Sequence, residues 1–384
     1  MSKTATEILL EEHIVRHLTF EDHYRFHSPD EYDRESCLLK SDLIDFLKAT
    51  QKDEYMSLVR STGSEEKAKK SIFERIKSEM KSGGTLNLLR QKDFDGGYGS
   101  HFKLIYFQPN SGRSEEHRLM YNENRLAIVR QLRYGVRPEN VEKEIDLAIF
   151  VNGFPVATIE LKNKQTGQTH MNAIKQYMRD RNPKGEPLLE FKRCLVHFAV
   201  GTEQVYMTTF LNGEKTRFFP FNKSFENQNE PGNPYRTCYL WEDVLTRDSL
   251  MDLIQNYINV QEIETTIYNP KKKQLEVEKK EALIFPRYHQ RRAVRKLLDD
   301  TYQRGAGHRY LIEHSAGSGK SNTITWLAFR LAALHNGENR THAIFDSVLV
   351  VTDRRVLDRQ LQRNLRQFAP ELGELECIDA RKNM

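Results

Sequence analysis

Apolar and polar side chains alternate along residues 144–163, and this alternation predicts two β-strands. The apolar runs 145–151 and 154–161 flank the dipeptide Asn152-Gly153, which is the strongest short-range signal for a β-hairpin. Because successive side chains of a strand point to opposite faces, one face carries the apolar residues Ile145, Leu147, Ile149, Ala157, Ile159 and Leu161. Asp146, Glu160 and Lys162 fall on the other face.

The loop of this hairpin decides which residues of the two strands oppose each other. If the Asn-Gly pair alone formed the loop, Ile145 would oppose Glu160, and the two carboxylates would lie on opposite faces. A three-residue loop that includes Phe154, or a β-bulge, places Asp146 directly across from Glu160 and also matches the apolar residues of the strands. We therefore predict the three-residue loop.

Helical periodicity predicts amphipathic helices on both sides of the hairpin, at residues 6–18, 41–47, 64–81, 122–134, 169–181 and 241–260. Two further strands are expected at 193–200 and 204–211. Together with the hairpin they predict an α/β fold with a mixed sheet and flanking helices. Arg125, Arg130 and Arg133 of the segment 122–134 are candidates for contact with DNA phosphates, although a solvated helix face is the commoner explanation.

The chain has 384 residues, which is enough for two or more domains, and its formal net charge of +5 permits nucleic-acid binding without demonstrating it. No run approaches the roughly 18 apolar residues of a membrane span, and the first residues lack the apolar core of a secretory signal. We therefore expect a cytoplasmic protein without membrane contact. Its four cysteines lack the spacing of a zinc site or a disulfide framework, so free buried thiols are expected.

The polar face of the hairpin contains the first group of candidate catalytic and metal-binding residues. Two carboxylates held side by side repel each other, and a hard divalent cation such as Mg²⁺ between them removes the repulsion. Asp146 and Glu160 are therefore candidate Mg²⁺ ligands. Lys162 is a candidate for orienting a water molecule or for stabilising charge during attack on a phosphodiester. A hairpin whose polar face simply meets water is the alternative interpretation, and it is the commoner one for an isolated pattern.

The spacing of these three residues resembles the D…ExK motif of the PD-(D/E)xK nuclease superfamily. In related nucleases the next helix carries a QxxxY motif, so the resemblance implies that Gln176 belongs to the catalytic site. The motif ends differently in this chain, because Asp180 replaces the tyrosine and Tyr177 directly follows the glutamine. The resemblance implies a nuclease-like mixed sheet with flanking helices and Mg²⁺-dependent cleavage of DNA.

A glycine-rich segment carries the second motif. Residues 309–321 predict a short strand, a glycine-rich turn and the start of the helix 322–333, which is the context of a phosphate-binding loop. In such a loop backbone N–H groups hold phosphates, the lysine reaches the β- and γ-phosphates, and the following hydroxyl binds Mg²⁺. His314 replaces the first glycine, and a chance match in a surface loop is the alternative. The expected ATP contacts are Ser315, Ala316, Gly317, Ser318, Gly319, Lys320 and Ser321, with Ser321 also a ligand of Mg²⁺.

Two neighbouring segments resemble parts of superfamily two helicases. Upstream, Gln290 directly precedes the predicted helix 291–298, at a position where such helicases often contact the adenine. Downstream, residues 347–355 predict a buried parallel strand, and the neighbourhood of Thr352 and Asp353 resembles a helicase segment that faces nucleic acid. With the phosphate-binding loop, these segments predict the first part of a RecA-like parallel-sheet domain.

A nuclease core followed by such a motor resembles the restriction subunit of type I restriction-modification enzymes. The resemblance implies a nuclease domain at 1–264 with its catalytic core at about 120–212, a linker at 265–283 and a partial helicase or translocase domain at 284–384. It also implies double-stranded DNA, a methyltransferase subunit and a specificity subunit as partners. In that assembly unmethylated DNA would be translocated with ATP hydrolysis and cut with the help of Mg²⁺.

The residues after Lys320 lack the paired carboxylates that hold Mg²⁺ and activate water in such motors. We therefore expect the chain to be an N-terminal portion that does not translocate DNA alone. Two alternatives stay open. One is a stand-alone repair or phage-defence nuclease-helicase, for which no neighbouring methyltransferase and specificity genes are expected. The other is a non-catalytic fragment that binds DNA or the methyltransferase.

Overall fold

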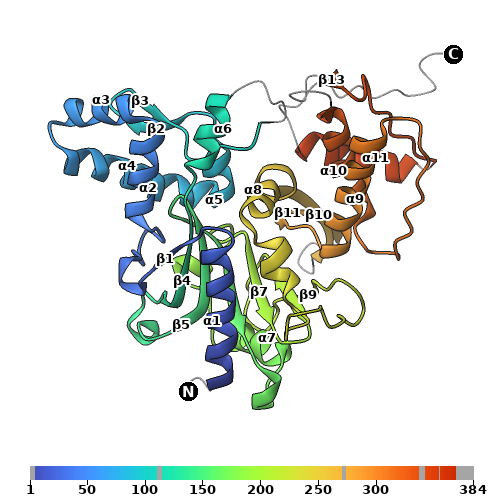
Figure 1. Cartoon of the computed structure of the whole chain (residues 1–384), viewed down its shortest axis with the longest axis horizontal. Coiled ribbons are helices and arrows are strands. Elements are labelled where there is room, and N and C mark those ends of the chain that lie inside the picture. Colours follow the sequence, from blue (N-terminus) through green and yellow to red (C-terminus); the bar gives the residue numbers. More distant parts are fainter. Residues whose placement is uncertain (1–4, 110–114, 270–273, 337–341, 354, 369–384) are drawn as a thin grey trace. The chain divides into compact units, whose positions relative to one another are not determined.

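The computed structural model describes residues 5–109, 115–269, 274–336, 342–353 and 355–368. The chain divides into two compact units (Figure 1). The first unit contains the residues up to 108 together with 115–255, and the second contains residues 109–114 and those from 256 onward. The candidate nuclease residues therefore lie in the first unit, and the candidate phosphate-binding loop lies in the second.

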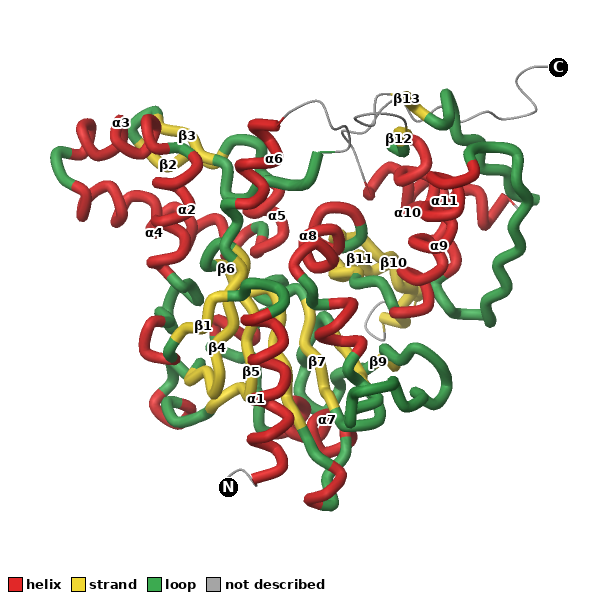
Figure 2. The backbone as a smooth tube through the Cα atoms, in the orientation of Figure 1, coloured by secondary structure: helices red, strands yellow, loops and turns green. Residues whose placement is uncertain are grey.

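A seven-stranded mixed sheet forms the centre of the first unit (Figure 2). β1 pairs in parallel with β4, β6 pairs in parallel with β7, and the other neighbours are antiparallel. The α/β arrangement with a mixed sheet is thereby confirmed. The strands lie in the order β1 (Arg25–His27), β4 (Leu126–Arg133), β5 (Glu144–Val151), β6 (Phe154–Leu161), β7 (Val196–Val200), β8 (Val205–Thr208) and β9 (Phe219–Pro220).

Helices cover the sheet, and α1 (Ala5–Phe20) and α7 (His170–Arg179) both contact β6. Phe150 of β5, Ala199 of β7 and Tyr177 of α7 belong to one buried apolar cluster. A polar side chain on that face of the sheet is therefore surrounded by apolar groups. The unit is completed by α2 (Lys40–Thr50), α3 (Lys52–Thr62), α4 (Glu65–Ser82), α5 (Gly84–Arg90), β2 (Phe94–Gly97), β3 (Ser100–Phe102), α6 (Glu115–Asn122) and α8 (Arg247–Asn256).

Helix α4 illustrates how the sequence sets the ends of an element. The hydroxyl of Ser64 accepts a hydrogen bond from the backbone N–H of Lys67 at 3.3 Å, and Gly83 follows the last helical residue. The helix predicted at 64–81 is thereby confirmed, as are those at 6–18 and 169–181 by α1 and α7. The buried stripe of α4 has the helical spacing that the pattern requires, with Ala68, Ile72, Ile76 and Met80.

The helix predicted at 122–134 is wrong, because residues 126–133 form strand β4. Its run of apolar residues pairs with β5 along its length, and this tertiary pairing outweighs the helical spacing of the arginines. Arg130 donates to the buried carboxylate of Glu11 at 2.7 Å, and Arg125 donates to Asp45 at 2.8 Å. These two arginines form ion pairs within the unit, which disfavours the candidate contact with DNA phosphates and agrees with the commoner explanation.

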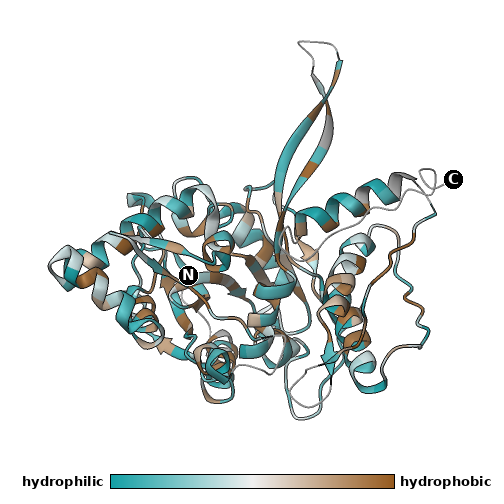
Figure 3. Ribbon diagram, turned by 90° about the horizontal axis from the view of Figure 1, so that it is seen from above, coloured by the Kyte–Doolittle hydropathy of each residue, from teal (hydrophilic) through white to brown (hydrophobic). Residues whose placement is uncertain are grey.

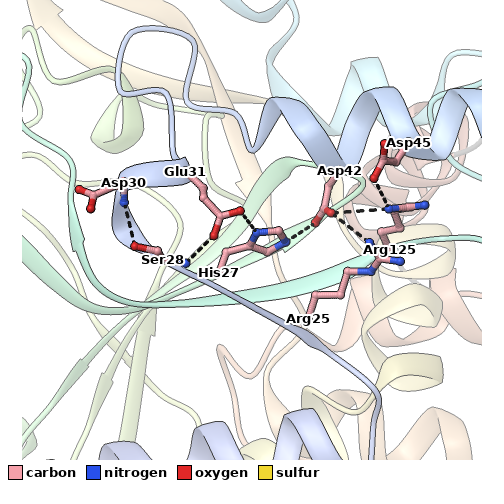
Figure 4. A network of polar contacts seen from close by, with 8 residues as sticks. All are labelled: Arg25, His27, Ser28, Asp30, Glu31, Asp42, Asp45 and Arg125. Carbon is pink, nitrogen blue, oxygen red and sulfur yellow. Dashed lines mark hydrogen bonds and ion pairs between the residues drawn. The ribbon is translucent and has the colours of Figure 1, made fainter.

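A cluster of charged side chains joins β1, the short helical turn η1 (Pro29–Glu31) and α2 (Figure 4). Nδ1 of His27 lies 2.8 Å from Glu31, and its Nε2 lies 3.1 Å from Asp42. Arg25 and Arg125 also face Asp42, at 3.6 Å and 4.0 Å. The hydrogen bond to Asp42, helped by that to Glu31, raises the pKa of His27 to about 9. The imidazole is therefore charged at neutral pH and compensates the buried carboxylate of Asp42.

The second unit begins with a long twisted hairpin of β10 (Asn259–Asn269) and β11 (Gln274–Ile284) (Figure 3). The segment 265–283, expected to be a linker, lies in this hairpin. Lys279 on one strand donates to Glu262 on the other at 2.8 Å, so the charges that suggested a boundary partly pair across the strands. The other elements are α9 (Tyr288–Arg304), α10 (Lys320–Ala332), β12 (His335–Asn336), β13 (His342–Ala343) and α11 (Arg355–Phe368).

Two strands expected in the second unit do not form. Residues 309–314 and 347–352 are neither helix nor strand, and the side chains of Leu311, Leu349 and Val351 are 93%, 76% and 80% exposed. Strands of a parallel sheet are stable when neighbours pair with both edges and helices cover both faces. The described residues offer these two segments no such pairing, so their apolar sequence alone does not make them strands.

The described residues also bear on the cysteines and on membrane-spanning helices. Cys37, Cys194 and Cys238 are free and buried, as expected, while Cys377 lies outside the described residues. Among the helices that the structure describes, none is both long enough and apolar enough to cross a membrane.

Candidate active site

The turn between β5 and β6 contains two residues, so the predicted three-residue loop is wrong. Val151 pairs with Phe154, and Asn152 and Gly153 between them have φ values of 49° and 82°. Asn152 tolerates this conformation because its buried side chain donates to the carbonyl of Leu104 at 2.9 Å and accepts from the N–H of Arg125 at 2.7 Å. Such contacts fix the short turn, and the sequence pattern does not reveal them.

A β-bulge restores the register that the apolar pattern requires. Phe150 pairs with Pro155, whereas Ile149 pairs with Ala157, so Val156 is an extra residue in β6. Beyond the bulge, Leu147 pairs with Ile159, which brings Asp146 opposite Glu160. Oδ2 of Asp146 accepts a hydrogen bond from the N–H of Leu161 at 2.7 Å. The predicted juxtaposition of the two carboxylates therefore holds, by way of the bulge.

Glu160 is completely buried and is held by Arg181. Nε of Arg181 donates to Oε1 of Glu160 at 2.7 Å. The second oxygen, Oε2, is buried and has no hydrogen-bond partner among the residues that the structure describes. Burial raises the pKa of Glu160 well above its ordinary value; the charge of Arg181 opposes this shift and the charge of Asp146 adds to it.

Arg181 follows the C-terminal end of α7 and reaches the start of β5. Its guanidinium also donates to the carbonyl of Glu144 and lies over the ring of Tyr134, with 5.7 Å between the guanidinium carbon and the ring centroid. Nζ of Lys143 donates to the carbonyl of Asp180, the residue before Arg181, at 2.8 Å. The sequence pattern does not indicate Arg181, since only the path of the chain after α7 brings it to Glu160.

The other predicted residues of the D…ExK pattern lie differently. Nζ of Lys162 donates to the carbonyl of Leu161 at 3.0 Å and is only partly buried. Gln176 is half-buried, and its side chain makes no hydrogen bond within the described ranges, although its carbonyl accepts from Asp180 at the end of α7. The structure thus brings Asp146 and Glu160 together and leaves the roles of Lys162 and Gln176 as predictions.

Tyr177, the residue after Gln176, points into the same buried face. Its hydroxyl lies 2.9 Å from the hydroxyl of Thr158, which in turn lies 2.7 Å from Nδ1 of His197. Burial lowers the pKa of His197 to about 3 and raises that of Tyr177, so both groups are neutral at pH 7. Single polar residues inside the apolar strands 156–161 and 196–200 were the available signal for this chain of hydrogen bonds.

The chemistry of these donors fits a hard divalent cation. Mg²⁺ retains several water molecules and needs only one or two carboxylates from the protein. Asp146 and the unpaired Oε2 of Glu160 supply such a pair. Within the described ranges, no group of three or more His, Cys, Asp or Glu side chains could hold a metal ion, which disfavours a fully protein-ligated site.

A cleft of about 860 Å³ lies beyond the C-terminal end of α7, lined by residues that flank Arg181, including Arg179 and Asn182. The rings of Phe191 and Phe210 meet edge to face in it, with centroids 5.2 Å apart. None of the predicted catalytic side chains lines this cleft. It is therefore a separate feature of the surface.

In the second unit, the predicted phosphate-binding loop leads into α10. Gly317 and Gly319 have φ values of 71° and 82°, which a side chain would disfavour, and Lys320 is the first residue of the helix. Nζ of Lys320 donates to the carbonyls of His314 and Ser315 at 3.0 Å and 2.9 Å. Residues 315–317 are exposed, Ser318 is buried and Ser321 is half-buried.

Gln290 holds this loop from the start of α9. Its Nε2 donates to the carbonyl of Gly319 at 2.9 Å, and its Oε1 accepts from the N–H of Arg287 at 2.8 Å. Both polar atoms of the Gln290 amide form hydrogen bonds within the protein, so contact of Gln290 with adenine stays a prediction. The ring of His314 meets the ring of His289 edge to face, with 5.0 Å between centroids.

Comparison with known families agrees with both halves of this description. The family model described as type I restriction enzyme R protein N terminus matches residues 6–216, which is more than half of the chain. A second model, described as SWI2/SNF2 ATPase, matches residues 289–382. No curated protein and no solved structure matches the chain significantly. On the first of these matches, the chain belongs to the family of type I restriction enzyme R proteins, whose N-terminal part it contains.

Proposed function

We propose that the first unit is a Mg²⁺-dependent nuclease that cleaves phosphodiesters of unmethylated double-stranded DNA. The observation that carries this proposal is the placement of Asp146 opposite Glu160, with one oxygen of Glu160 buried and unpaired. A buried unpaired oxygen costs free energy, on the order of 1 to 3 kcal/mol. A ligand that completes this oxygen would remove the cost, and a divalent cation is the ligand that two adjacent carboxylates favour.

In this proposal Asp146 and Glu160 would hold Mg²⁺, which when bound supplies a Lewis acid and an acidified water. Lys162 extends from the end of β6 and stabilises the negative charge that develops on the phosphate. Gln176 is retained as a candidate for orienting the nucleophilic water. The chain of hydrogen bonds from Tyr177 to His197 fixes α7 against the sheet and keeps bulk water from the buried side of the site.

We further propose that residues 284–384 bind ATP through the loop 315–321, with Lys320 on the phosphates, Ser321 on Mg²⁺ and Gln290 at the adenine. Residues 1–264 then form the nuclease domain, with its core at about 120–212, and the hairpin around 265–283 connects the two. The similarity to SWI2/SNF2 ATPases supports this assignment. Translocation of DNA, and assembly with a methyltransferase and a specificity subunit in the cytoplasm, follow from the family and are part of the proposal.

Nicking of supercoiled DNA in Mg²⁺ tests the nuclease, with the full chain alone and with added methyltransferase and specificity subunits. Asp146→Ala should abolish nicking, whereas Asp53→Ala, a change of an exposed aspartate in α3, should leave it unchanged. Equal nicking by the wild type and Asp146→Ala contradicts the proposal. Absence of nicking by the wild type under both conditions contradicts it as well.

Nucleotide binding has its own test. Lys320→Ala removes the amine that now bridges two carbonyls of the loop and should abolish measurable binding of ATP. Lys296→Ala, on α9 of the same unit, is the matched control. A fluorescent ATP analogue that binds the wild type and Lys320→Ala equally well would remove the assignment of the loop.

A further inference from the structure

Arg181 forms a hydrogen bond with only one of the two carboxylate oxygens of Glu160. A guanidinium can bind a carboxylate with two parallel hydrogen bonds, and a purely structural pair gains most from that arrangement. Arg181 instead donates once to Glu160, through Nε, and directs its second donor to the main-chain carbonyl of Glu144. One oxygen of Glu160 is thereby satisfied, and the other stays unpaired within the described structure although it is buried.

The position of Arg181 is fixed by elements on both sides of it. It follows Asp180, the C-cap residue of α7, whose carbonyl accepts from Lys143 at 2.8 Å. Its guanidinium lies over the buried ring of Tyr134, and its side chain is only 7% exposed. These contacts hold the guanidinium of Arg181 in place. Its hydrogen bond to Glu160 therefore limits the rotation of the Glu160 carboxylate.

Charge alone does not explain this arrangement. A buried ion pair is weak evidence for stability, because apolar residues of similar volume often replace such a pair without loss. The site also contains the second carboxylate, Asp146, whose charge raises the pKa of Glu160, whereas the charges of Arg181 and Lys162 lower it. A divalent cation beside Asp146 and the unpaired oxygen would complete the charge, while Arg181 would hold the opposite oxygen.

We propose that Arg181 is a positioning residue for the metal site: it fixes Oε1 of Glu160 and thereby presents Oε2 to the divalent cation. This inference rests on the proposed nuclease function. Partners that orient a metal-binding side chain typically contribute 10- to 100-fold to metal affinity. Lysine at the same position would keep the charge and lose the fork that bonds Glu160 and Glu144 together.

The test is the affinity of the full chain for Mn²⁺, which replaces Mg²⁺ and is detected by electron paramagnetic resonance. Arg181→Lys should weaken Mn²⁺ binding about tenfold or more. Arg179→Lys is the matched control, because Arg179 is an exposed residue of the same helix that lies 3.7 Å from Glu214, and it should bind as the wild type does. A folded Arg181→Lys protein with wild-type affinity overturns the inference, even if its thermal stability is lower, since a merely structural role predicts that result.

A second variant keeps the test decisive if Arg181→Lys does not fold. Tyr134→Leu removes the aromatic face beneath the guanidinium and leaves all charges in place, so it should weaken Mn²⁺ binding by up to about fivefold. Unchanged affinity in this variant overturns the inference. Failure of the wild type to bind Mn²⁺ refutes the proposed metal site itself, and so distinguishes that failure from a failure of the role of Arg181.

Discussion

Asp42 and Glu160 are both completely buried carboxylates of the first unit, and their surroundings differ in charge. Asp42 faces three cationic side chains, His27, Arg25 and Arg125, at 3.1 to 4.0 Å. Glu160 is hydrogen-bonded to one cation, Arg181, and has the second carboxylate of Asp146 beside it. Asp42 therefore faces three cations, whereas Glu160 has one hydrogen-bonded cation, a further charge from Lys162 and a second carboxylate beside it.

This difference distinguishes a structural network from a candidate site. The cluster around Asp42 ties β1 to α2, and its buried Oδ1, which has no hydrogen bond within the described residues, lies 3.6 Å from Arg25 and 4.0 Å from Arg125 (Figure 4). The cluster around Glu160 also leaves a buried carboxylate oxygen without a hydrogen bond within the described residues, but it places a second acid, Asp146, in the same register. Burial of a charged group alone therefore does not indicate function; the balance of charge around it does.

Exchanging the two acids for their amides should separate their roles, and the largest effect is expected at Glu160. Glu160→Gln removes a proposed ligand of the cation, so Mg²⁺-dependent nicking should fall at least about 1000-fold, which corresponds to about 4 kcal/mol of transition-state stabilisation. Asp42→Asn, assayed at a temperature where it is folded, should nick DNA like the wild type. Equal losses in the two variants would erase the distinction between the clusters.

Stability should show the opposite order. Asp42→Asn leaves buried cationic groups without their partner, and we expect the free energy of unfolding to fall by about 3 kcal/mol. Urea denaturation followed by circular dichroism measures this change, with Asp53→Asn, at an exposed acid of α3, as control. A loss below about 1 kcal/mol would show that the cluster around Asp42 is not a structural network.

The pH dependence of stability should report His27. Its pKa is about 9 in the folded protein and 6.5 in the unfolded chain, so folding favours the protonated form. The stabilisation is fully present below pH 6.5 and is lost as the pH rises through 9, by on the order of 2 kcal/mol after screening at this partly exposed site. In His27→Gln this part of the pH profile should be flat, and an unchanged slope would contradict the assignment.

The smallest effect is expected for the neutral chain of hydrogen bonds beside Glu160. Thr158→Val removes the hydroxyl that links Tyr177 to His197 and should cost about 1 to 3 kcal/mol of stability. Mn²⁺ affinity should change less than twofold, because the carboxylates and Arg181 are untouched. A larger loss of affinity would mean that the hydroxyls take part in the metal site.

The sequence predicted the strands, their polar face and the opposition of Asp146 and Glu160, because alternation and apolar matching are local properties. The pattern left a β-bulge as the alternative to the three-residue loop and could not choose it, since the two-residue turn is fixed by contacts of Asn152 with Leu104 and Arg125, distant in sequence. The pattern of the segment 126–133 predicts a helix, because the pairing with β5 that makes it a strand is tertiary.

Arg181 was beyond the reach of sequence reasoning for a similar reason. The motif of related nucleases directed attention to Gln176, whereas the orientation of α7 turns Tyr177 toward the sheet and the chain after the helix carries Arg181 to Glu160. In the second unit, the turn and helix of the phosphate-binding loop follow from local signals. The two apolar segments expected to be strands depend on neighbours that the pattern does not supply.

Diffraction from crystals of the full chain soaked in Mn²⁺ tests the central claim most directly. We expect an anomalous peak bound by Asp146 and by Oε2 of Glu160, with Arg181 still on Oε1. A Mn²⁺-saturated crystal with no peak between the two carboxylates would contradict the account, because the unpaired oxygen of Glu160 would then have no ligand to explain it.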